Sequence, residues 1–334
     1  MPKERAKSSP YAVIKYLILL AVACVLLWFS FKGIKWSDFK EGLIRADFKW
    51  IAASMLIGVL AFLFRSLRWR LLMLPLSGRV KRIDAWDGVN IGYITNFVIP
   101  RAGEFARCGV ITGKRGLPYE SVVGTVVLER MIDLLALVMV TFTVILIRWE
   151  KFGGFIYREI FEVIEKRFSL NIFWVVAVLT LSLLIFAYII YRYRETHPFL
   201  RKVVEITKGI IHGVVSGFKM PQKWLFLLYT VLIWVCYWQM SYATILAFPS
   251  VTGLSLADAL FLSIVGGLGW VIPVQGGIGA YHFIVSLALT SIYGIGRTEG
   301  VVFATISHES QVLTMLIFGA ISLINFSFFN KKKR

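Results

Sequence analysis

Charged residues that could bind an anion lie inside stretches of this sequence that are otherwise apolar. The first group combines helix-shaping residues with ionised side chains: Pro100, Arg101, Gly103, Glu104 and Arg107. A proline at a first helical position with a glycine nearby lets a helix begin with its free N–H groups facing a cavity, which attracts anions. Arginine suits phosphate because its planar guanidinium stays charged and donates paired hydrogen bonds. The segment therefore predicts a phosphate-binding environment. The alternative is that both arginines flank a loop and extend to the interface.

A second group, Glu129, Arg130 and Asp133, begins eight residues into an apolar stretch that starts near Ser121. In a membrane helix Glu129 would lie about 12 Å deep, where each charge costs about 2.5–3.5 kcal/mol. Glu129 and Asp133 share a helix face, and Arg130 can reach Asp133. Charges at this depth need partners or water, so a ligand site is the first interpretation.

The formal charges of these two groups cancel. The first has two positive charges and one negative charge, and the second has two negative charges and one positive charge. The balance fits an internal ion lock between the two segments. It fits equally a switchable cluster, in which an anionic ligand competes with Glu129 or Asp133 for the arginines.

A third group places glycines near histidines and a carboxylate. Its members are Pro273, Gln275, Gly276, Gly277, Gly279, His282, His308 and Glu309. Closely spaced glycines permit unusual dihedral angles, and without a preceding strand they do not form a nucleotide-binding fingerprint. The histidines could relay protons with Glu309 or contact a ligand. The alternative is that each histidine is a packed, hydrogen-bonded core residue.

Spacings typical of catalytic and metal sites do not occur in the sequence. There is no HExxH, CxxC or nucleophile-elbow pattern and no ATP-binding motif. Cys24, Cys108 and Cys236 are spread too widely to indicate a disulfide framework or a zinc site. We therefore expect no catalytic residue, no metal and no cofactor.

The elements that must position these residues are membrane helices. Hydrophobic residues make up 58% of the chain and charged residues 17%, with a mean hydropathy of +0.74, whereas soluble domains are roughly 45–50% apolar. Within lipid, a helix satisfies its own backbone groups. We predict an all-α polytopic membrane protein built as a single integral membrane domain. About six full spans are expected, at residues 11–31, 50–64, 121–147, 171–191, 224–247 and 300–326.

Two further apolar stretches are short and stop at a proline. Residues 85–113 and 258–293 each predict a re-entrant helical hairpin, which gives about eight membrane segments. The two share a motif, Ile99-Pro100-x-x-Gly103 and Ile272-Pro273-x-x-Gly276. Residues 50–147 and 224–326 then become inverted-repeat halves. Opposed hairpins of this kind indicate a binding site near the bilayer midplane.

Loop charges orient these segments. Residues 65–82 carry six basic and no acidic residues, and residues 192–223 carry seven basic against two acidic ones. Both are predicted to be cytoplasmic, and the second could form an amphipathic surface helix. With residues 148–169 and 248–257 outside, both termini lie in the cytoplasm of a multi-pass protein of the cell membrane. The net charge of +18 then indicates contact with anionic lipid headgroups and not with nucleic acid.

Four motifs resemble those of the transmembrane flippase-like family, which includes the membrane domain of lysylphosphatidylglycerol synthase/flippase proteins. They are Arg65-x-x-Arg68-Trp69-Arg70-x-Leu72, Pro100-Arg101-Ala102-Gly103-Glu104-x-x-Arg107, Glu129-Arg130-x-x-Asp133 and Pro273-x-x-Gly276-Gly277-Ile278-Gly279. The resemblance covers about residues 11–326. It implies a helical membrane fold with re-entrant segments that moves aminoacylated or other anionic lipids between leaflets.

Two departures from the family pattern affect this expectation. These residues contain no soluble aminoacyl-transferase domain, so aminoacylation of lipid by that route is not expected. Family members often carry a glutamate soon after the glycine run, whereas Tyr281 and His282 stand there. The identity of the lipid is therefore left open.

The expected function is that of a lipid flippase or transporter whose substrate is a phosphate-bearing membrane lipid, aminoacylated or polyprenyl-linked. Arg101, Arg107 and Arg130 would neutralise the phosphate, and Glu104, Glu129 and Asp133 would position those arginines. The alternatives are a non-transporting enzyme or partner in membrane lipid or polyprenyl-glycan synthesis, and a structural scaffold. Formation of a homo-oligomer is left open.

Overall fold

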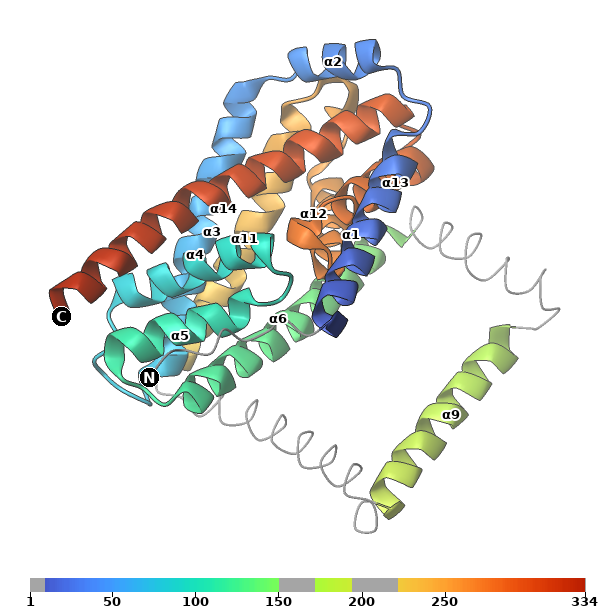
Figure 1. Cartoon of the computed structure of the whole chain (residues 1–334). Helices are drawn as coiled ribbons and strands as arrows, with labels where there is room; N and C mark the ends of the chain where they lie inside the picture. The colour runs from blue at the N-terminus through green and yellow to red at the C-terminus, as the bar shows by residue number, and fades with distance from the viewer. Residues whose placement is uncertain (1–9, 150–171, 194–221, 334) are drawn as a thin grey trace. The chain divides into compact units, whose positions relative to one another are not determined.

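The computed structural model describes residues 10–149, 172–193 and 222–333, and within them every regular element is a helix (Figure 1). This confirms the predicted all-α membrane fold. The helices are α1 (Pro10–Phe31), α2 (Trp36–Ile44), α3 (Phe48–Met73), α4 (Arg82–Val98), α5 (Gly103–Arg115), α6 (Tyr119–Ile147), α9 (Ile172–Tyr193), α11 (Lys223–Leu246), η2 (Pro249–Val251), α12 (Leu256–Val271), η3 (Gln275–Gly277), α13 (Ala280–Tyr293) and α14 (Arg297–Lys333).

The chain forms two compact units. The first comprises residues 1–126 and 224–334, and the second comprises residues 127–223. Helix α6 begins in the first unit and continues into the second. The predicted loop at 148–169 and the predicted amphipathic segment at 192–223 fall almost entirely outside the described residues.

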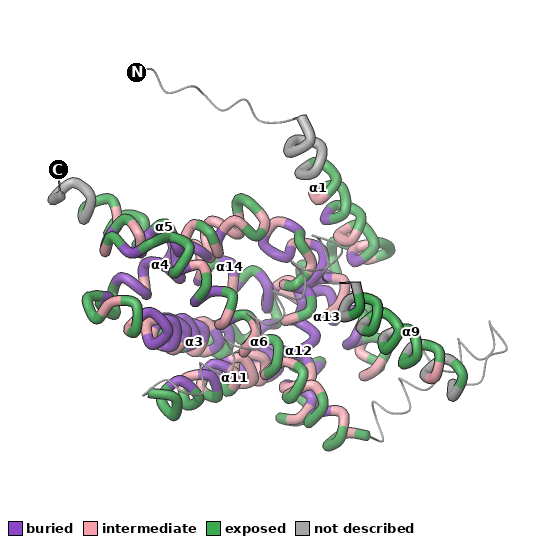
Figure 2. Tube along the Cα trace, turned by 90° about the horizontal axis from the view of Figure 1, so that it is seen from below, coloured by how far each residue is buried: buried purple, intermediate pink, exposed green. Residues whose placement is uncertain are grey.

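Several helices are long and apolar enough to cross a membrane. Helices α3, α6, α11 and α14 meet this condition, as predicted, and so does the segment Gln275–Tyr293, which the sequence assigned to half of a hairpin. Helix α1 joins them if it is counted with α2, toward which the chain bends by 86°. The described residues thus hold five or six candidate spans. Many apolar side chains of α6, and most of those that the structure describes in α9, are exposed, as expected for surfaces that face lipid (Figure 2).

Helix α3 is longer than the predicted span at 50–64. Asp47 caps its first turn by accepting a hydrogen bond from the Lys49 amide, and the helix continues to Met73, two residues before Pro75, where a proline disfavours further helix. The extra turns carry Arg65 and Arg68, which the sequence assigned to a basic loop. Both are buried, because the helix turns them toward neighbouring helices instead of water.

Helix α2 was not predicted. The chain leaves α1 through Gly33, whose φ of 82° suits glycine, and forms a short helix that buries Phe39 and exposes Trp36 and Ile44. The side chain of Val302 on α14 packs directly on Gly42. Apolar and polar residues alternate at helical spacing in this segment, and that pattern could have predicted the helix. Mean hydropathy alone does not, because the segment is not apolar enough to be read as a membrane span.

Helices α4 and α5, with the turn between them, form an antiparallel pair that we call hairpin 1. A Cβ atom at Gly92 would lie 3.0 Å from the main-chain oxygen of Gly103, so the helices touch through glycine backbone near the tip. At the open end Arg115 contacts Asp84. The last residue of α5 is followed by Gly116 in the left-handed conformation, a common helix ending.

Helices α12 and α13, with η3 between them, form hairpin 2. Ser255 and Asp258 make a reciprocal capping box at its start, and Gly294 ends it in the left-handed conformation. The Tyr281 backbone packs on Gly269 near the tip, so that a Cβ there would lie 2.7 Å from the Tyr281 Cα. Both hairpins thus occupy the predicted positions, and each ends at a glycine in the left-handed conformation.

The first half of helix α14 packs against hairpin 2, and its second half packs against hairpin 1. The contacts along α14 run from the open end of hairpin 2 through its tip to hairpin 1: Gly300 with Ser286, Ser307 with Tyr281, His308 with Gly276, Gly319 with Ile94, and Asn325 with Asp87. The two tips therefore meet partway along α14.

Candidate functional site

The tips of the two hairpins touch each other. Arg101 of hairpin 1 donates a hydrogen bond of 2.7 Å from Nη2 to the main-chain oxygen of Val271 in hairpin 2. The ring of Phe97 lies against Gly276, where a Cβ atom would come within 2.5 Å of the ring. The two broken segments that the sequence singled out as Pro100–Gly103 and Pro273–Gly279 are therefore in direct contact.

Arg101 sits in a strained turn. Its φ of 63° makes it the one non-glycine residue with positive φ among residues 10–149, 172–193 and 222–333, a conformation that is costly for a side chain with Cβ. The next helix begins at Gly103, whose amide donates to Asn96 Oδ1 at 2.7 Å. The first amide of α5, expected to face a ligand, is thus already bonded to a side chain of its own hairpin.

Glu104 lies beside this turn, in the first turn of α5, and is partly buried. A carboxylate in a first helical turn is favoured by the helix dipole. This local role is independent of any ligand, so the predicted contact of Glu104 with substrate stays a prediction.

Arg107 points elsewhere than Arg101. It is 3% exposed, and its guanidinium lies 4.7 Å from the ring centroid of Trp69 on α3. The Trp69 indole is fixed in turn by a 3.0 Å hydrogen bond from Nε1 to Thr125 Oγ1. A cation over an indole face is stabilised by the ring quadrupole, so this geometry holds α5 to α3.

The residues of the second predicted group belong to the second compact unit. Glu129 is fully buried. Arg130 Nη1 lies 3.8 Å from Asp133 Oδ2, with the side chains 42% and 18% exposed, so the predicted pairing of residues three apart is confirmed. The predicted binding role of all three residues stays a prediction.

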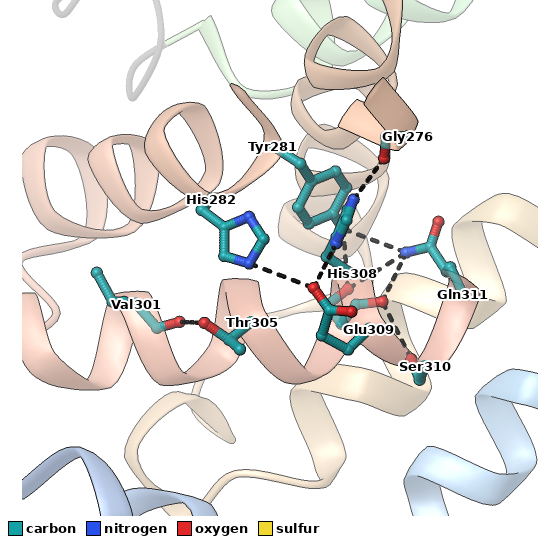
Figure 3. Close-up of polar contacts among 10 residues, drawn as sticks. Gly276, Tyr281, His282, Val301, Thr305, His308, Glu309, Ser310 and Gln311 are labelled. Atoms are coloured by element: carbon teal, nitrogen blue, oxygen red, sulfur yellow. Dashed lines mark hydrogen bonds and ion pairs between the residues drawn. The ribbon is translucent and has the colours of Figure 1, made fainter. Parts of the chain in front are cut away.

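The third predicted group does assemble, around His308 (Figure 3). His308 is fully buried, with Nε2 at 2.8 Å from the main-chain oxygen of Gly276 and Nδ1 at 2.9 Å from Glu309 Oε1. His282 Nε2 lies 3.7 Å from the same Glu309 oxygen. The indole of Trp270 stacks on the His308 ring with centroids 5.1 Å apart.

The glycines of this group shape the tip of hairpin 2. Gly276, Gly277 and Gly279 have φ values of 54°, 74° and 80°, which side chains with Cβ rarely adopt. A Cβ at Gly277 would also lie 3.3 Å from the Trp270 ring. Pro273 lies between the end of α12 and these glycines. It has no amide hydrogen, so it cannot donate a hydrogen bond to a main-chain oxygen of α12.

Gln275 sits in the same turn. Its Oε1 is buried and accepts no hydrogen bond from the part of the chain that the structure describes. A buried acceptor without a donor is costly, so Gln275 offers an acceptor to a ligand or to water at the hairpin junction.

Sequence reasoning missed an ionic network at the open end of hairpin 1. Lys114 Nζ lies 2.5 Å from Asp87 Oδ2, which also accepts a 2.7 Å hydrogen bond from Asn325 of α14. Arg115 Nε lies 2.5 Å from Asp84 Oδ2. The sequence could have indicated this network, since Asp87 falls inside the stretch predicted to enter the membrane, where a carboxylate needs a partner. The network joins α4, α5 and α14, which is a structural role.

A second missed set holds hairpin 2 to α14. Tyr281 Oη lies 2.8 Å from Ser307 Oγ and accepts a 3.3 Å hydrogen bond from Gln311 Nε2. Tyr281 occupies a position where the sequence noted only a departure from the family pattern. Its hydroxyl now has a defined partner on another helix, which fixes the helix that carries His282.

Comparison with known proteins places these features in a family context. The family model described as the lysylphosphatidylglycerol synthase TM region matches residues 16–319. The glycosyltransferase AglD of Haloferax volcanii is 31% identical over 122 residues, which is 36% of this chain and 19% of that protein. This chain thus spans about a fifth of that relative's length. No solved structure matches.

Proposed function

This chain belongs to the family of the lysylphosphatidylglycerol synthase transmembrane region, and from that membership we propose that it is a flippase for a phosphate-bearing membrane lipid. The headgroup enters the junction of the two hairpin tips while the acyl or prenyl tails stay in the bilayer. Arg101 binds the phosphate. Glu104, which lies in the first turn of α5 beside Arg101, contributes to binding, and the binding roles that the sequence predicts for Arg107, Glu129, Arg130 and Asp133 stay predictions.

One observation carries the proposal: ionisable side chains are exposed where a membrane helix should face lipid. The Glu309 side chain is 55% exposed, and it lies 12 residues after the start of α14 at Arg297, about 18 Å along the helix axis. Arg101 is exposed at the touching tips. A bare charge near the bilayer centre costs about 2.5–3.5 kcal/mol or more. Exposure at this depth therefore favours a wet, headgroup-accessible junction.

The chemistry of Arg101 favours phosphate as the recognised group. One arm of its guanidinium is used by the Val271 oxygen, and the planar fork has further N–H donors. Phosphate accepts such paired donors, as carboxylate does. The touching broken helices are also the arrangement in which transporters bind substrate at the repeat interface.

Orientation follows from the loop charges and is part of the same proposal. The exposed basic residues Arg79, Lys81 and Arg82, where α3 connects to α4, face the cytoplasm, and both termini lie on that side of the cell membrane. Basic residues there contact anionic lipid headgroups, which raises the local concentration of substrate at the cytoplasmic leaflet.

Headgroup accessibility in proteoliposomes tests the transport function. Purified full-length protein is reconstituted with a labelled anionic phospholipid, and bleaching by a membrane-impermeant reagent is followed over time. We expect faster crossing than in empty vesicles, and an Arg101→Ala variant to be about tenfold slower or worse, because a charge-assisted hydrogen bond is lost. Arg45→Ala, which removes an exposed arginine paired with Glu41 on α2, is the matched control. Equal crossing in protein-containing and empty vesicles, across several anionic lipids, would refute the proposal.

The similarity to AglD, a glycosyltransferase, favours a second candidate, a non-transporting role in polyprenyl-linked glycan synthesis. Native mass spectrometry of the purified protein separates the two. A co-purified polyprenyl phosphate without any crossing activity supports this second role, whereas a co-purified phospholipid together with crossing supports the flippase.

A further inference from the structure

We propose that His282, His308 and Glu309 form a binding site for a divalent transition-metal ion. The ion that suits the site best is zinc, and one of its coordination positions is left open. The inference stands on the geometry of these three side chains and does not depend on lipid transport. All three belong to the same compact unit, and their candidate ligand atoms lie within 4.8 Å of one another.

The hydrogen-bond roles around His308 require a cation between it and Glu309. Nε2 faces the main-chain oxygen of Gly276 at 2.8 Å, and because a carbonyl only accepts, Nε2 carries the ring proton. In the neutral ring Nδ1 is then a bare lone pair. It faces a carboxylate oxygen of Glu309 at 2.9 Å, and two lone pairs at that separation repel. Either an additional proton or a metal ion fills the gap.

His282 supplies the evidence for a metal ion over a proton. The side chain is 3% exposed, its Nδ1 has no hydrogen-bond partner within the described chain, and its Nε2 is 3.7 Å from Glu309 Oε1, beyond hydrogen-bond range. An unmade hydrogen bond of a buried group costs about 1–3 kcal/mol. The cost at Nδ1 is the same in both cases, but a metal ion bound by all three side chains gives Nε2 a bond in place of its 3.7 Å separation from Glu309, whereas a proton held between His308 and Glu309 gives it none.

The spacing suits a small tetrahedral ion. Zinc binds histidine nitrogen and carboxylate oxygen at about 2.0–2.2 Å, so neighbouring ligand atoms lie roughly 3.3–3.5 Å apart. The separations of 2.9 Å and 3.7 Å in this site lie on either side of that range. The third separation, between the two histidine nitrogens, is within 4.8 Å, so closing around an ion needs a histidine ring to move inward by up to about one ångström.

The surroundings of His308 match those of a metal-bound histidine. Such histidines donate their second ring N–H to a carboxylate or a backbone carbonyl, which fixes the tautomer and the ring orientation. The Gly276 oxygen has this role, and Trp270 stacks on the ring from another direction. Gly277 leaves room for the Trp270 ring, since a Cβ there would lie 3.3 Å from it.

The donor set selects the class of metal. Two imidazoles and one carboxylate suit zinc and related transition metals, whereas magnesium and calcium prefer oxygen ligands alone. Three protein ligands leave a fourth position for water or another ligand, as in open zinc sites. That position faces the exposed side of Glu309, because the two histidines are buried.

Metal titration of the full-length, tag-free protein in detergent tests the site. After treatment with a chelator, zinc is added and binding is followed by isothermal calorimetry, with magnesium as the comparison ion. We expect one zinc per chain and no comparable uptake of magnesium. His282→Phe, which removes a side chain without a hydrogen bond to residues that the structure describes, and Glu309→Gln should each weaken binding more than about tenfold.

The matched control is Glu299→Gln, an exposed carboxylate on the same helix, which should bind zinc as the unaltered protein does. The exposed Cys24 is retained in every variant, so adventitious zinc on the thiol appears equally in all of them. Because Glu309 is exposed, Glu309→Gln should fold normally even if His282→Phe does not.

Cobalt substitution gives an independent structural readout. X-ray absorption on the cobalt form should show two imidazole nitrogens and a carboxylate oxygen, and loss of one imidazole in His282→Phe. No saturable zinc binding, or equal affinity in the unaltered protein and Glu309→Gln, would overturn the proposal and leave a shared proton between His308 and Glu309. Neither outcome bears on lipid crossing, which is measured separately.

Discussion

The guanidinium of Arg101 donates a 2.7 Å hydrogen bond to the main-chain oxygen of Val271, the last residue of α12. The final carbonyl groups of a helix lack partners within it and carry the negative end of its dipole. Pro273, two residues on, has no amide hydrogen with which to satisfy them. Arg101 supplies the donor from the opposing hairpin. A strained residue at the tip of one hairpin thus completes the helix end of the other.

Replacing Arg101 by glycine or by alanine separates its backbone strain from its charge. Both variants lose the bond to Val271, but only glycine is relaxed at a φ of 63°. We expect Arg101→Gly to be more stable than Arg101→Ala by about 1–2 kcal/mol, and both to be impaired in lipid crossing. Thermal unfolding in detergent alongside the crossing assay measures the two effects. Equal stability of the two variants would contradict the strained turn.

The contact between Phe97 and Gly276 predicts a coupled pair of mutations. Gly276→Ala places a Cβ 2.5 Å from the Phe97 ring at a residue with positive φ, so it should lower the free energy of unfolding by about 1–3 kcal/mol for overlap in addition to about 1–2 kcal/mol for strain. Gly294→Ala is the control, since it has positive φ and nothing within 4 Å. Adding Phe97→Ala should relieve the overlap alone. Additive effects of Gly276→Ala and Phe97→Ala would show that the tips do not touch.

Two glycines of α5 should respond in opposite directions to alanine. A Cβ at Gly103 would overlap the main-chain oxygen of Gly92. Because the backbone of a packed helix cannot move aside as a flexible side chain can, Gly103→Ala should lower the free energy of unfolding by about 3 kcal/mol or more. Gly109 has nothing within 4 Å, and its change to alanine should stabilise the helix by up to about 1 kcal/mol. Melting temperatures of the two variants provide the test, and a tolerated Gly103→Ala would be inconsistent with the close packing of hairpin 1.

The buried network at the open end of hairpin 1 predicts rescue by a second mutation. Asp87→Asn leaves the buried Lys114 ammonium without its nearest countercharge, and removing one partner of such a pair typically costs about 3–5 kcal/mol. Lys114→Met in the same chain should recover most of that loss, because the unpaired ammonium is gone and the remaining buried carboxylate, Asp84, keeps its contact with Arg115. Unfolding temperatures of the single and double variants measure this. Glu41→Gln, which breaks the exposed pair with Arg45, should change little. A double variant no more stable than Asp87→Asn would argue against the network.

Some site residues were found because their own position in the chain carries the information. A proline beside glycines inside an apolar stretch interrupts a helix whatever surrounds it, so Pro100 and Pro273 marked both hairpin tips. His308 and Glu309 are consecutive on a helix, which made them a candidate pair. The neighbour of Arg107 could not be found this way, because Trp69 lies on another helix and arginine has no local preference between an indole face and a phosphate.

The sequence by itself determined that this is a helical membrane protein with two broken segments, because a bilayer imposes the same length, hydropathy and backbone requirement on every segment regardless of its neighbours. Only the tertiary structure decided which polar groups meet. His282 approaches Glu309, Arg101 reaches Val271, and Asp87 pairs with Lys114 through the packing of different helices against one another. Such pairings depend on the packing angles and the registers between helices, and neither can be read from the hydropathy of the sequence.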